Sequence, residues 1–126
     1  MPFVTFTLLK GRTRKEKKNL SDAVHTALVN SGVPTGDKFH RFLELEKENL
    51  IYDPNYPDLT TPRTENFVVI EILLSVGRSV KIKKKILSDL VQQAQRSGLS
   101  PNDIFVIFKE TTWENWAFAG GVQIHI

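Results

Sequence analysis

The sequence contains no cysteine among its 126 residues. A disulfide framework, a thiolate metal site and a cysteine nucleophile are therefore excluded. The sequence also has no apolar run close to the roughly 20 residues that span a bilayer, and its opening MPFVTFTLLKGR has no basic region ahead of a short apolar run. We therefore expect a soluble, unexported protein of the cytoplasm that has no membrane partner.

Motifs for metals and phosphates are also lacking. The 3 histidines (His25, His40 and His125) are scattered, and no acidic cluster or Gly-rich loop accompanies them. A metal site or a phosphate loop needs such residues at defined spacings. A Ser-His-Asp triad stays open, because it has no obligatory sequence motif. We expect no metal and no cofactor.

The net charge is +3, and the positive residues gather in two runs, Arg12–Lys18 and Lys81–Lys85. Each run lies beside an apolar stripe with helical spacing, which is typical of the solvated face of a helix. No aromatic-rich strand of the kind found in RNA-binding domains accompanies them. A nucleic-acid partner is therefore not expected, although a non-catalytic module that binds an anion or a nucleic acid remains an alternative.

The chain contains an internal repeat. The segment GRTRKEKKNLSD at 11–22 resembles GRSVKIKKKILSD at 77–89. The likeness continues beyond the lysines, at an offset of 66 positions. Ser31, Gly32, Asp37, Phe39, Phe42 and Glu44 recur as Ser97, Gly98, Asp103, Phe105, Phe108 and Glu110. One supersecondary unit therefore occurs twice.

Periodicity indicates the elements of this unit. The apolar runs 3–9 and 67–74 are typical of strands covered on both faces. Thr13 with Glu16 forms a capping box ahead of an amphipathic helix, and Ser79 begins its counterpart. Gly32 and Gly98 stand where helix C-terminal caps belong, and short strands are predicted at 38–45 and 104–109.

The predicted fold is a single α/β domain over 1–126, built as a tandem β-α-β repeat. A β-α-β crossover is right-handed and places its strands in parallel, so units 2–46 and 67–110 predict one four-stranded sheet with two helices on one face. The other face is too apolar to meet water, and we expect neighbouring subunits to cover it. A linker at 47–66, anchored by Tyr52 and Tyr56, joins the units, and a C-terminal hairpin at 111–126 ends in a strand, VQIHI.

The second residue has its own chemistry. Met1 precedes Pro2, whose small side chain permits removal of the initiator methionine. A free secondary amine at the start of a buried strand would then result. The usual pKa of an α-amino group is about 7.7 to 8.0, and burial or nearby cations lower it. Such an amine is a suitable general base near neutral pH.

Four features together resemble the tautomerase superfamily: Met-Pro before an apolar strand, LLKGRT at its end, the tandem β-α-β units, and WENWAFAGG near the C-terminus. The resemblance covers nearly the whole chain and is strongest to the branch that contains malonate semialdehyde decarboxylase. It implies the fold of 4-oxalocrotonate tautomerase, an N-terminal proline that acts as base or acid, arginines that bind a carboxylate, and a homotrimer.

Carried over residue by residue, the resemblance assigns catalysis to Pro2 and Asp37, and substrate binding to Arg78, Trp116 and Phe118. It implies a tautomerase acting on a small 2-oxo or enol carboxylic acid. Decarboxylase or hydratase activity is the alternative, in which the aspartate would activate water or polarise the substrate. Structural roles for the aspartate and the two aromatic residues also remain open.

The chain departs from the decarboxylase pattern at the turn after the second long strand. That pattern has two closely spaced arginines, whereas Ser75, Val76 and Gly77 precede the single Arg78 here. One cation for the substrate is therefore missing, which disfavours decarboxylation more than tautomerisation. The repeat has a counterpart arginine, Arg12, but the residue corresponding to the proline is the internal Phe67. We therefore expect only one of the two equivalent sites to carry proline chemistry.

Overall fold

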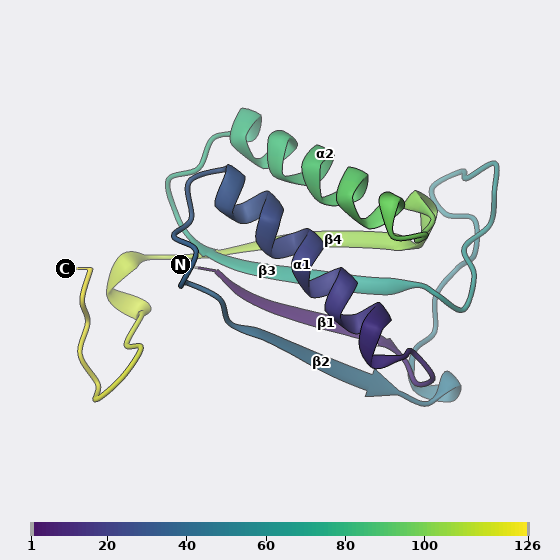
Figure 1. The fold of residues 1–126 in the computed structure, drawn as a ribbon, viewed down its shortest axis with the longest axis horizontal. Coiled ribbons are helices and arrows are strands. Elements are labelled where there is room, and N and C mark those ends of the chain that lie inside the picture. Colours follow the sequence, from purple (N-terminus) through teal and green to yellow (C-terminus); the bar gives the residue numbers. More distant parts are fainter. Residues whose placement is uncertain (1, 126) are drawn as a thin grey trace.

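A computed structural model describes residues 2–125 of the chain (Figure 1). Two strand-helix-strand units follow one another, and their elements are β1 (Phe3–Leu9), α1 (Arg14–Asn30), β2 (His40–Leu45), β3 (Val68–Ser75), α2 (Val80–Arg96) and β4 (Ile104–Thr111). Neither of these two helices has the length and apolar character needed to cross a membrane. The predicted tandem β-α-β repeat is confirmed.

The four strands form one mixed sheet in the order β2-β1-β3-β4. Strands within each unit are parallel: Val4 of β1 lies opposite His40 of β2, and Val68 of β3 lies opposite Ile104 of β4. The central pair is antiparallel, so β1 and β3 run in opposite directions. The start of β1 therefore lies beside the end of β3, which brings the beginning of the first unit to the turn of the second.

Both helices begin at the predicted caps. The Thr13 hydroxyl accepts a hydrogen bond from the Glu16 amide at 3.1 Å, and the Glu16 carboxylate accepts one from the Thr13 amide at 3.0 Å. In α2 the Ser79 hydroxyl accepts a hydrogen bond from the Ile82 amide at 3.1 Å. Gly32 follows the end of α1 with a φ of +114°, a left-handed conformation that favours glycine. The capping predictions are thus confirmed.

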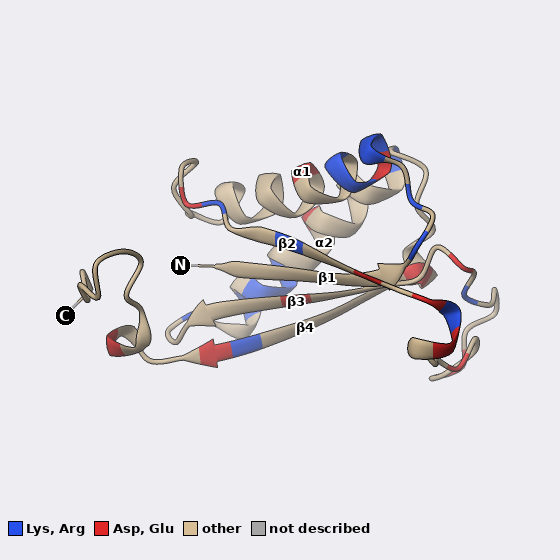
Figure 2. Ribbon diagram, turned by 90° about the horizontal axis from the view of Figure 1, so that it is seen from below, with Lys and Arg blue, Asp and Glu red and all other residues tan. Residues whose placement is uncertain are grey.

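The hydrophobic core lies between the helix layer and one face of the sheet. Figure 2 shows both helices on the same side of the four strands, as predicted. The largest fully buried side chains of this core come from β1, α1, β3 and α2: Phe6, Leu8, Leu28, Ile70, Ile72, Leu74, Ile86 and Leu90. The lysine runs lie on the outside of the helices, where Lys15, Lys18, Lys84 and Lys85 are exposed.

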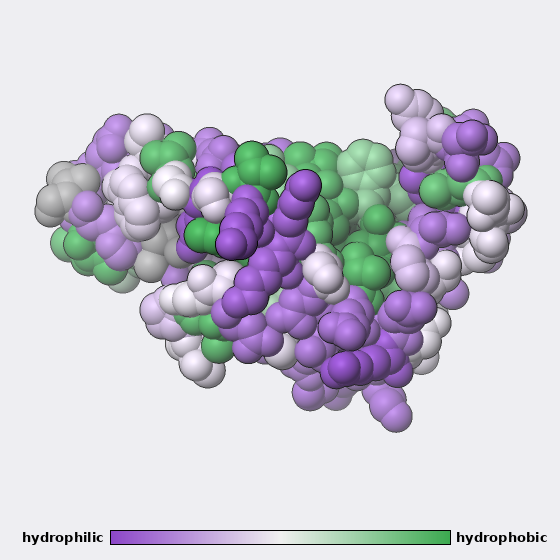
Figure 3. Space-filling view, turned by 90° about the horizontal axis from the view of Figure 1, so that it is seen from above, coloured by the Kyte–Doolittle hydropathy of each residue, from purple (hydrophilic) through white to green (hydrophobic). Residues whose placement is uncertain are grey.

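The opposite face of the sheet carries large apolar side chains that no helix of the chain covers. Alternation along β2 and β4 places Leu43, Phe105 and Ile107 on this face, where they are 43%, 43% and 36% exposed. Figure 3 shows apolar surface along the side of the sheet, next to the charged surface of the helix layer. An apolar surface of this kind is typical of a protein interface.

The linker is held by Tyr52. Its ring stacks on Phe67 at a centroid distance of 4.2 Å, and its hydroxyl donates to the Thr64 carbonyl at 2.6 Å. The prediction that Tyr56 is a second anchor is wrong, since its side chain is 67% exposed. The Asp53 carboxylate instead holds this turn through the backbone, accepting a hydrogen bond from the Tyr56 amide at 2.7 Å.

The predicted C-terminal strand is also wrong over residues 122–125, and its last residue, Ile126, lies outside the described residues. The turn before it does form, because the Val122 amide donates to the Ala119 carbonyl at 3.2 Å. The segment then folds back, so that the His125 ring lies 5.3 Å from the Trp113 ring. A strand requires a neighbouring strand to pair its backbone, and packing of aromatic rings replaces that pairing here.

Candidate active site

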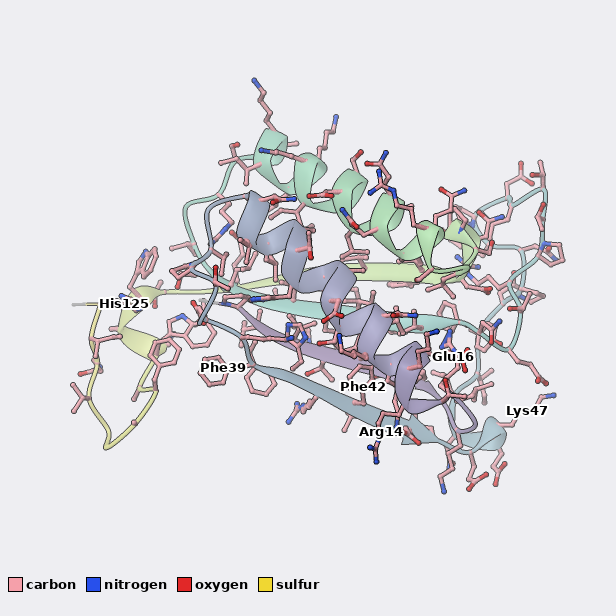
Figure 4. The ribbon with its side chains drawn as sticks, viewed as in Figure 1. Arg14, Glu16, Phe39, Phe42, Lys47 and His125 are labelled. Carbon is pink, nitrogen blue, oxygen red and sulfur yellow. The ribbon has the colours of Figure 1, made fainter. Side chains whose placement is uncertain are left out.

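Four separate segments meet at one end of the sheet, around the beginning of β1. The Val4 amide donates to the Phe39 carbonyl at 2.9 Å, which joins β1 to the loop that carries Asp37. The Val76 amide donates to the Thr111 carbonyl at 2.9 Å, which joins the β3–α2 turn to the end of β4. Figure 4 shows Phe39 and His125 at this end, with Glu16 and Lys47 at the other.

Pro2 stands at the centre of this end because it immediately precedes β1. It is buried, and the next residue, Phe3, lies opposite Leu73 of β3. The antiparallel register therefore places Pro2 beside the last residues of β3 and the turn that follows them. Burial disfavours the charged form of an amine, so this position would lower the pKa of a free proline nitrogen.

Arg78 lies in that turn, directly ahead of the Ser79 cap of α2. Its guanidinium folds back toward the end of β3, with Nη1 3.4 Å from the Ser75 carbonyl. This contact is long for a hydrogen bond, and within the described residues no carboxylate forms an ion pair with Arg78. The hydroxyl of Ser75 is fully buried and has no hydrogen-bond partner in the same part of the chain. The turn therefore presents a cation, next to a buried hydroxyl at the end of β3.

Asp37 enters the site from the loop between α1 and β2. The loop closes on itself, since the Asp37 amide donates to the Pro34 carbonyl at 3.0 Å and the Lys38 amide to the Gly36 carbonyl at 3.0 Å. Phe39 then leads into β2, two residues later than predicted, because this turn occupies the beginning of the expected strand. Asp37 as a whole residue is partly exposed, but both oxygens of its carboxylate are buried.

An aromatic wall of Phe39, Trp116, Phe118 and His125 closes the same end. Phe118 stacks on Trp116 at a centroid distance of 5.7 Å and on Phe39 at 6.0 Å, and His125 packs edge-on against Phe118 at 5.8 Å. The indole nitrogen of Trp116 is buried and meets no acceptor among residues 2–125. The structure thus brings Trp116 and Phe118 to the end that holds Pro2.

Three residues at this end were not identified from the sequence as part of a site: Phe39, His125 and His25. Phe39 recurs in the repeat as Phe105, so it was read as a strand residue. His125 was assigned to a strand, whereas for His25 the sequence does not decide between a functional and a structural role. The His25 Nε2 atom lies 2.9 Å from the Thr35 carbonyl in the Asp37 loop. The contacts of these three residues join segments that are distant in sequence or lie across a loop. A local sequence pattern does not predict such contacts.

His40 lies near this loop on the first residue of β2. Its Nδ1 atom is 2.7 Å from the Ser21 hydroxyl of α1, and its ring is 5.9 Å from the ring of His25. Burial, followed by the positive charge of Lys38, lowers the pKa of His40 to about 4. The imidazole is therefore neutral at neutral pH. Among residues 2–125 no group of three or more His, Asp or Glu side chains is placed to hold a metal ion.

The equivalent end of the second unit is built differently. The Arg12 side chain is only 9% exposed and lies 3.6 Å from the Glu16 carboxylate, and its Nη2 donates to the Asn66 carbonyl at 3.1 Å. Phe67, the counterpart of Pro2, is 3% exposed and packs beneath Tyr52. A cavity of about 240 Å³ remains beside Arg12. These residues hold the linker in place.

Comparisons with known proteins agree with this architecture. Two family models, both described as tautomerase enzyme, match residues 37–119 and 2–58. Two proteins of Bacillus subtilis strain 168, the probable tautomerases YusQ and YrdN, are each 28% identical over 123 residues. These alignments cover 96% of this chain and 95% and 93% of the relatives.

Solved structures give the same result. A malonate semialdehyde decarboxylase, studied as wild type, mutant and inactivated enzyme, is 28% identical and superposes with a TM-score of 0.88 over 96% of this chain and 93% of its own. Native fused 4-OT is 18% identical, with a TM-score of 0.76 over 94% and 93%, and shares the fold. The matched models, the relatives and the shared fold together show that this chain belongs to the tautomerase enzymes.

Proposed function

We propose that this enzyme moves a proton between oxygen and carbon of a small 2-oxo or enol carboxylic acid, with the amine of Pro2 as the base and acid. The observation that carries the proposal is the meeting of Pro2, Arg78, Asp37 and the aromatic wall at one end of the sheet. The family and the relatives support a tautomerase, and the proposal adds the residues and the class of substrate.

The proposed reaction leaves the protein unchanged. In the direction from enol to keto form, the hydroxyl proton leaves the oxygen as the C–O bond becomes a carbonyl, and the far carbon of the former C=C double bond gains a proton. The amine of Pro2 accepts one proton and donates one, so it returns to its initial state after each turnover. This requires removal of Met1, because an amide nitrogen has no basic lone pair.

Arg78 and the aromatic wall orient the substrate in this proposal. A guanidinium binds a carboxylate through two parallel hydrogen bonds, and the long 3.4 Å contact with the Ser75 carbonyl leaves the donors of Arg78 available. Trp116 and Phe118 exclude water, which strengthens electrostatic interactions inside the site. The buried indole N–H of Trp116 supplies a further donor for a substrate oxygen.

Asp37 is proposed to polarise the substrate or to direct a water molecule. The second role belongs to an alternative activity, decarboxylation or hydration of a 3-oxo acid, which is favoured by the TM-scores of 0.88 with two malonate semialdehyde decarboxylases. The single arginine of the turn disfavours it. Release of carbon dioxide from malonate semialdehyde, and loss of that release in Asp37→Asn, would establish the alternative.

A homotrimer in the cytoplasm is the proposed working form. The exposed apolar face of the sheet supports a self-association, and fused 4-OT, which has the same fold, was solved as a trimer. The lack of cysteine agrees with a reducing compartment. Ile107→Asp should yield monomers in sedimentation velocity, because it buries a charge in the interface, whereas Val80→Asp, on an exposed helix residue, should leave the assembly intact.

The principal test follows the ultraviolet decay of phenylenolpyruvate. We first expect the intact mass to lack Met1. We then expect Pro2→Ala to lower kcat/KM by about 100-fold or more, the usual contribution of a general acid-base group. Pro62→Ala, in the linker at the opposite end, is the matched control and should retain the wild-type rate. Equal rates for wild type and Pro2→Ala would remove proline catalysis.

A further inference from the structure

The loop that carries Asp37 is linked to α1 by side chains of His25 and of Lys38, whose Nζ atom lies 3.8 Å from the Asp22 carboxylate. His25 Nε2 lies 2.9 Å from the backbone carbonyl of Thr35, two residues before Asp37. A carbonyl oxygen can only accept, so the Nε2 atom must carry the proton and donate it. The Asp37 and Lys38 amides donate within the loop, and the Phe39 carbonyl accepts a hydrogen bond from the Val4 amide of β1.

The imidazole of His25 is itself held in place. Its ring packs edge-on against His40 at 5.9 Å, and His40 is fixed by the Ser21 hydroxyl at 2.7 Å and by the ring of Phe6 at 5.5 Å. The helix beneath is rigid, because it is capped at Thr13 and buries one face in the core. The hydrogen bond therefore joins an exposed loop to a capped helix that packs on the core.

The second unit shows that the fold does not require this histidine. At the offset of 66 positions the counterpart of His25 is Val91, whose side chain has no donor. The corresponding loop is stabilised by the Ser100 hydroxyl, which accepts from the Asn102 amide at 3.3 Å, and by Asp103. The histidine occurs only in the unit that supplies the candidate catalytic carboxylate.

We propose that His25 is a positioning residue of the active site: its Nε2–H holds the Thr35 carbonyl and thereby sets the position of the Asp37 carboxylate relative to Pro2. This inference rests on the proposed function. Small displacements of a reacting group carry large penalties in rate, so a single hydrogen bond in this loop affects turnover more than substrate affinity. His25 does not contact the substrate itself.

The test compares two substitutions that differ in one hydrogen-bond donor. His25→Phe keeps a ring but removes the donor, and His25→Gln keeps an amide donor of similar reach. We expect His25→Phe to lower kcat on phenylenolpyruvate about tenfold with little change in KM, and His25→Gln to retain most of the rate. Val91→Ala, at the counterpart position, should leave kcat unchanged.

Two further measurements separate positioning from general destabilisation. Amide hydrogen exchange of the 34–39 loop should accelerate in His25→Phe and stay slow in His25→Gln. In the background of Asp37→Asn, His25→Phe should cause no additional loss of kcat, because residues that act through one another are not additive. If His25→Phe does not fold, His25→Asn, whose amide is too short to reach Thr35, replaces it.

The inference is overturned by equal losses in His25→Phe and His25→Gln, or by a His25→Phe effect that is retained in full in Asp37→Asn. Different results would refute this inference and the proposed function. An active Pro2→Ala enzyme would refute the proline mechanism, whereas unchanged exchange of the loop in His25→Phe would refute the positioning role.

Discussion

Asp37 and Asp103 stand at equivalent places in the two halves, and the structure uses them differently. Asp103 is 2% exposed, and its two carboxylate oxygens accept hydrogen bonds from the amide and the hydroxyl of Thr64, both at 2.7 Å. Asp37 is a partly exposed residue whose carboxylate oxygens are buried, in a loop near the beginning of β1. In the second half the carboxylate fastens the linker to the sheet, and in the first it borders the candidate site.

The paired arginines show the same division. Arg12 is nearly buried and lies against the Glu16 carboxylate and the Asn66 carbonyl. Arg78 has only the long contact with the Ser75 carbonyl among the described residues. A duplicated unit can therefore keep an arginine at the same turn in different surroundings: Arg12 is nearly buried and donates through Nη2 to the Asn66 carbonyl, while its Nε and Nη1 atoms have no hydrogen-bond partner among residues 2–125.

The largest difference in stability should come from the two aspartates. Asp103→Ala should lower the free energy of unfolding by about 2 to 3 kcal/mol, because it leaves the partly buried Thr64 amide and hydroxyl without a charged acceptor. Asp37→Ala should cost less, about 1 kcal/mol, because the Asp37 residue is more exposed than Asp103. Urea denaturation measures both. Equal losses would mean that the first loop is as structural as the second.

A smaller, pH-dependent difference should come from His40, whose counterpart at the offset of 66 is Val106. The pKa of His40 is lowered from 6.5 to about 4 in the folded chain. Between these values the unfolded chain binds more protons, so stability should be full above about pH 6.5 and fall as the pH drops toward 4. We expect a loss of about 1 to 2 kcal/mol, since the ring is only partly buried.

The control for this pH effect replaces His40 by valine, the residue at the equivalent position of the second unit. His40→Val has no titrating group and packs as Val106 does in the second unit. Its unfolding free energy should decline less between pH 6.5 and pH 4 than that of the wild type. The same pH dependence in both proteins would assign the effect to other groups.

The smallest difference concerns the two helix caps. Thr13→Ala removes one arm of a reciprocal capping box and should cost about 1 kcal/mol. Ser79→Ala removes a single hydrogen bond of 3.1 Å to the Ile82 amide and should cost slightly less. Thermal unfolding monitored by circular dichroism gives the order, and a larger cost for Ser79→Ala would contradict the role of the box.

Local patterns in the sequence predict most of this fold. The strand at 3–9, the Thr13 and Ser79 caps and the parallel pairing within each unit follow from apolar periodicity and chain geometry. The strand expected at the C-terminus does not form over 122–125, because alternating residues do not report whether a partner strand is within reach. The exposed ring of Tyr56 was mistaken for an anchor for a similar reason.

The candidate site was predictable only in part. The resemblance identified Pro2, Asp37, Arg78, Trp116 and Phe118 as candidates, and their roles remain proposals. Contacts such as His25 with Thr35, or Phe39 with Phe118, arise from packing across loops and carry no motif. The two halves differ at the position of His25, whose counterpart is Val91, and this difference distinguishes the first loop from the second.

The central claim is that only the end containing Pro2 is catalytic. Its most direct test is kcat/KM for phenylenolpyruvate in Arg78→Ala and Arg12→Ala, each shown to be folded. We predict a loss of at least about tenfold in Arg78→Ala, which removes a charge-assisted pair with the carboxylate, and a rate within about twofold of wild type in Arg12→Ala. Equal losses in the two variants would contradict the claim.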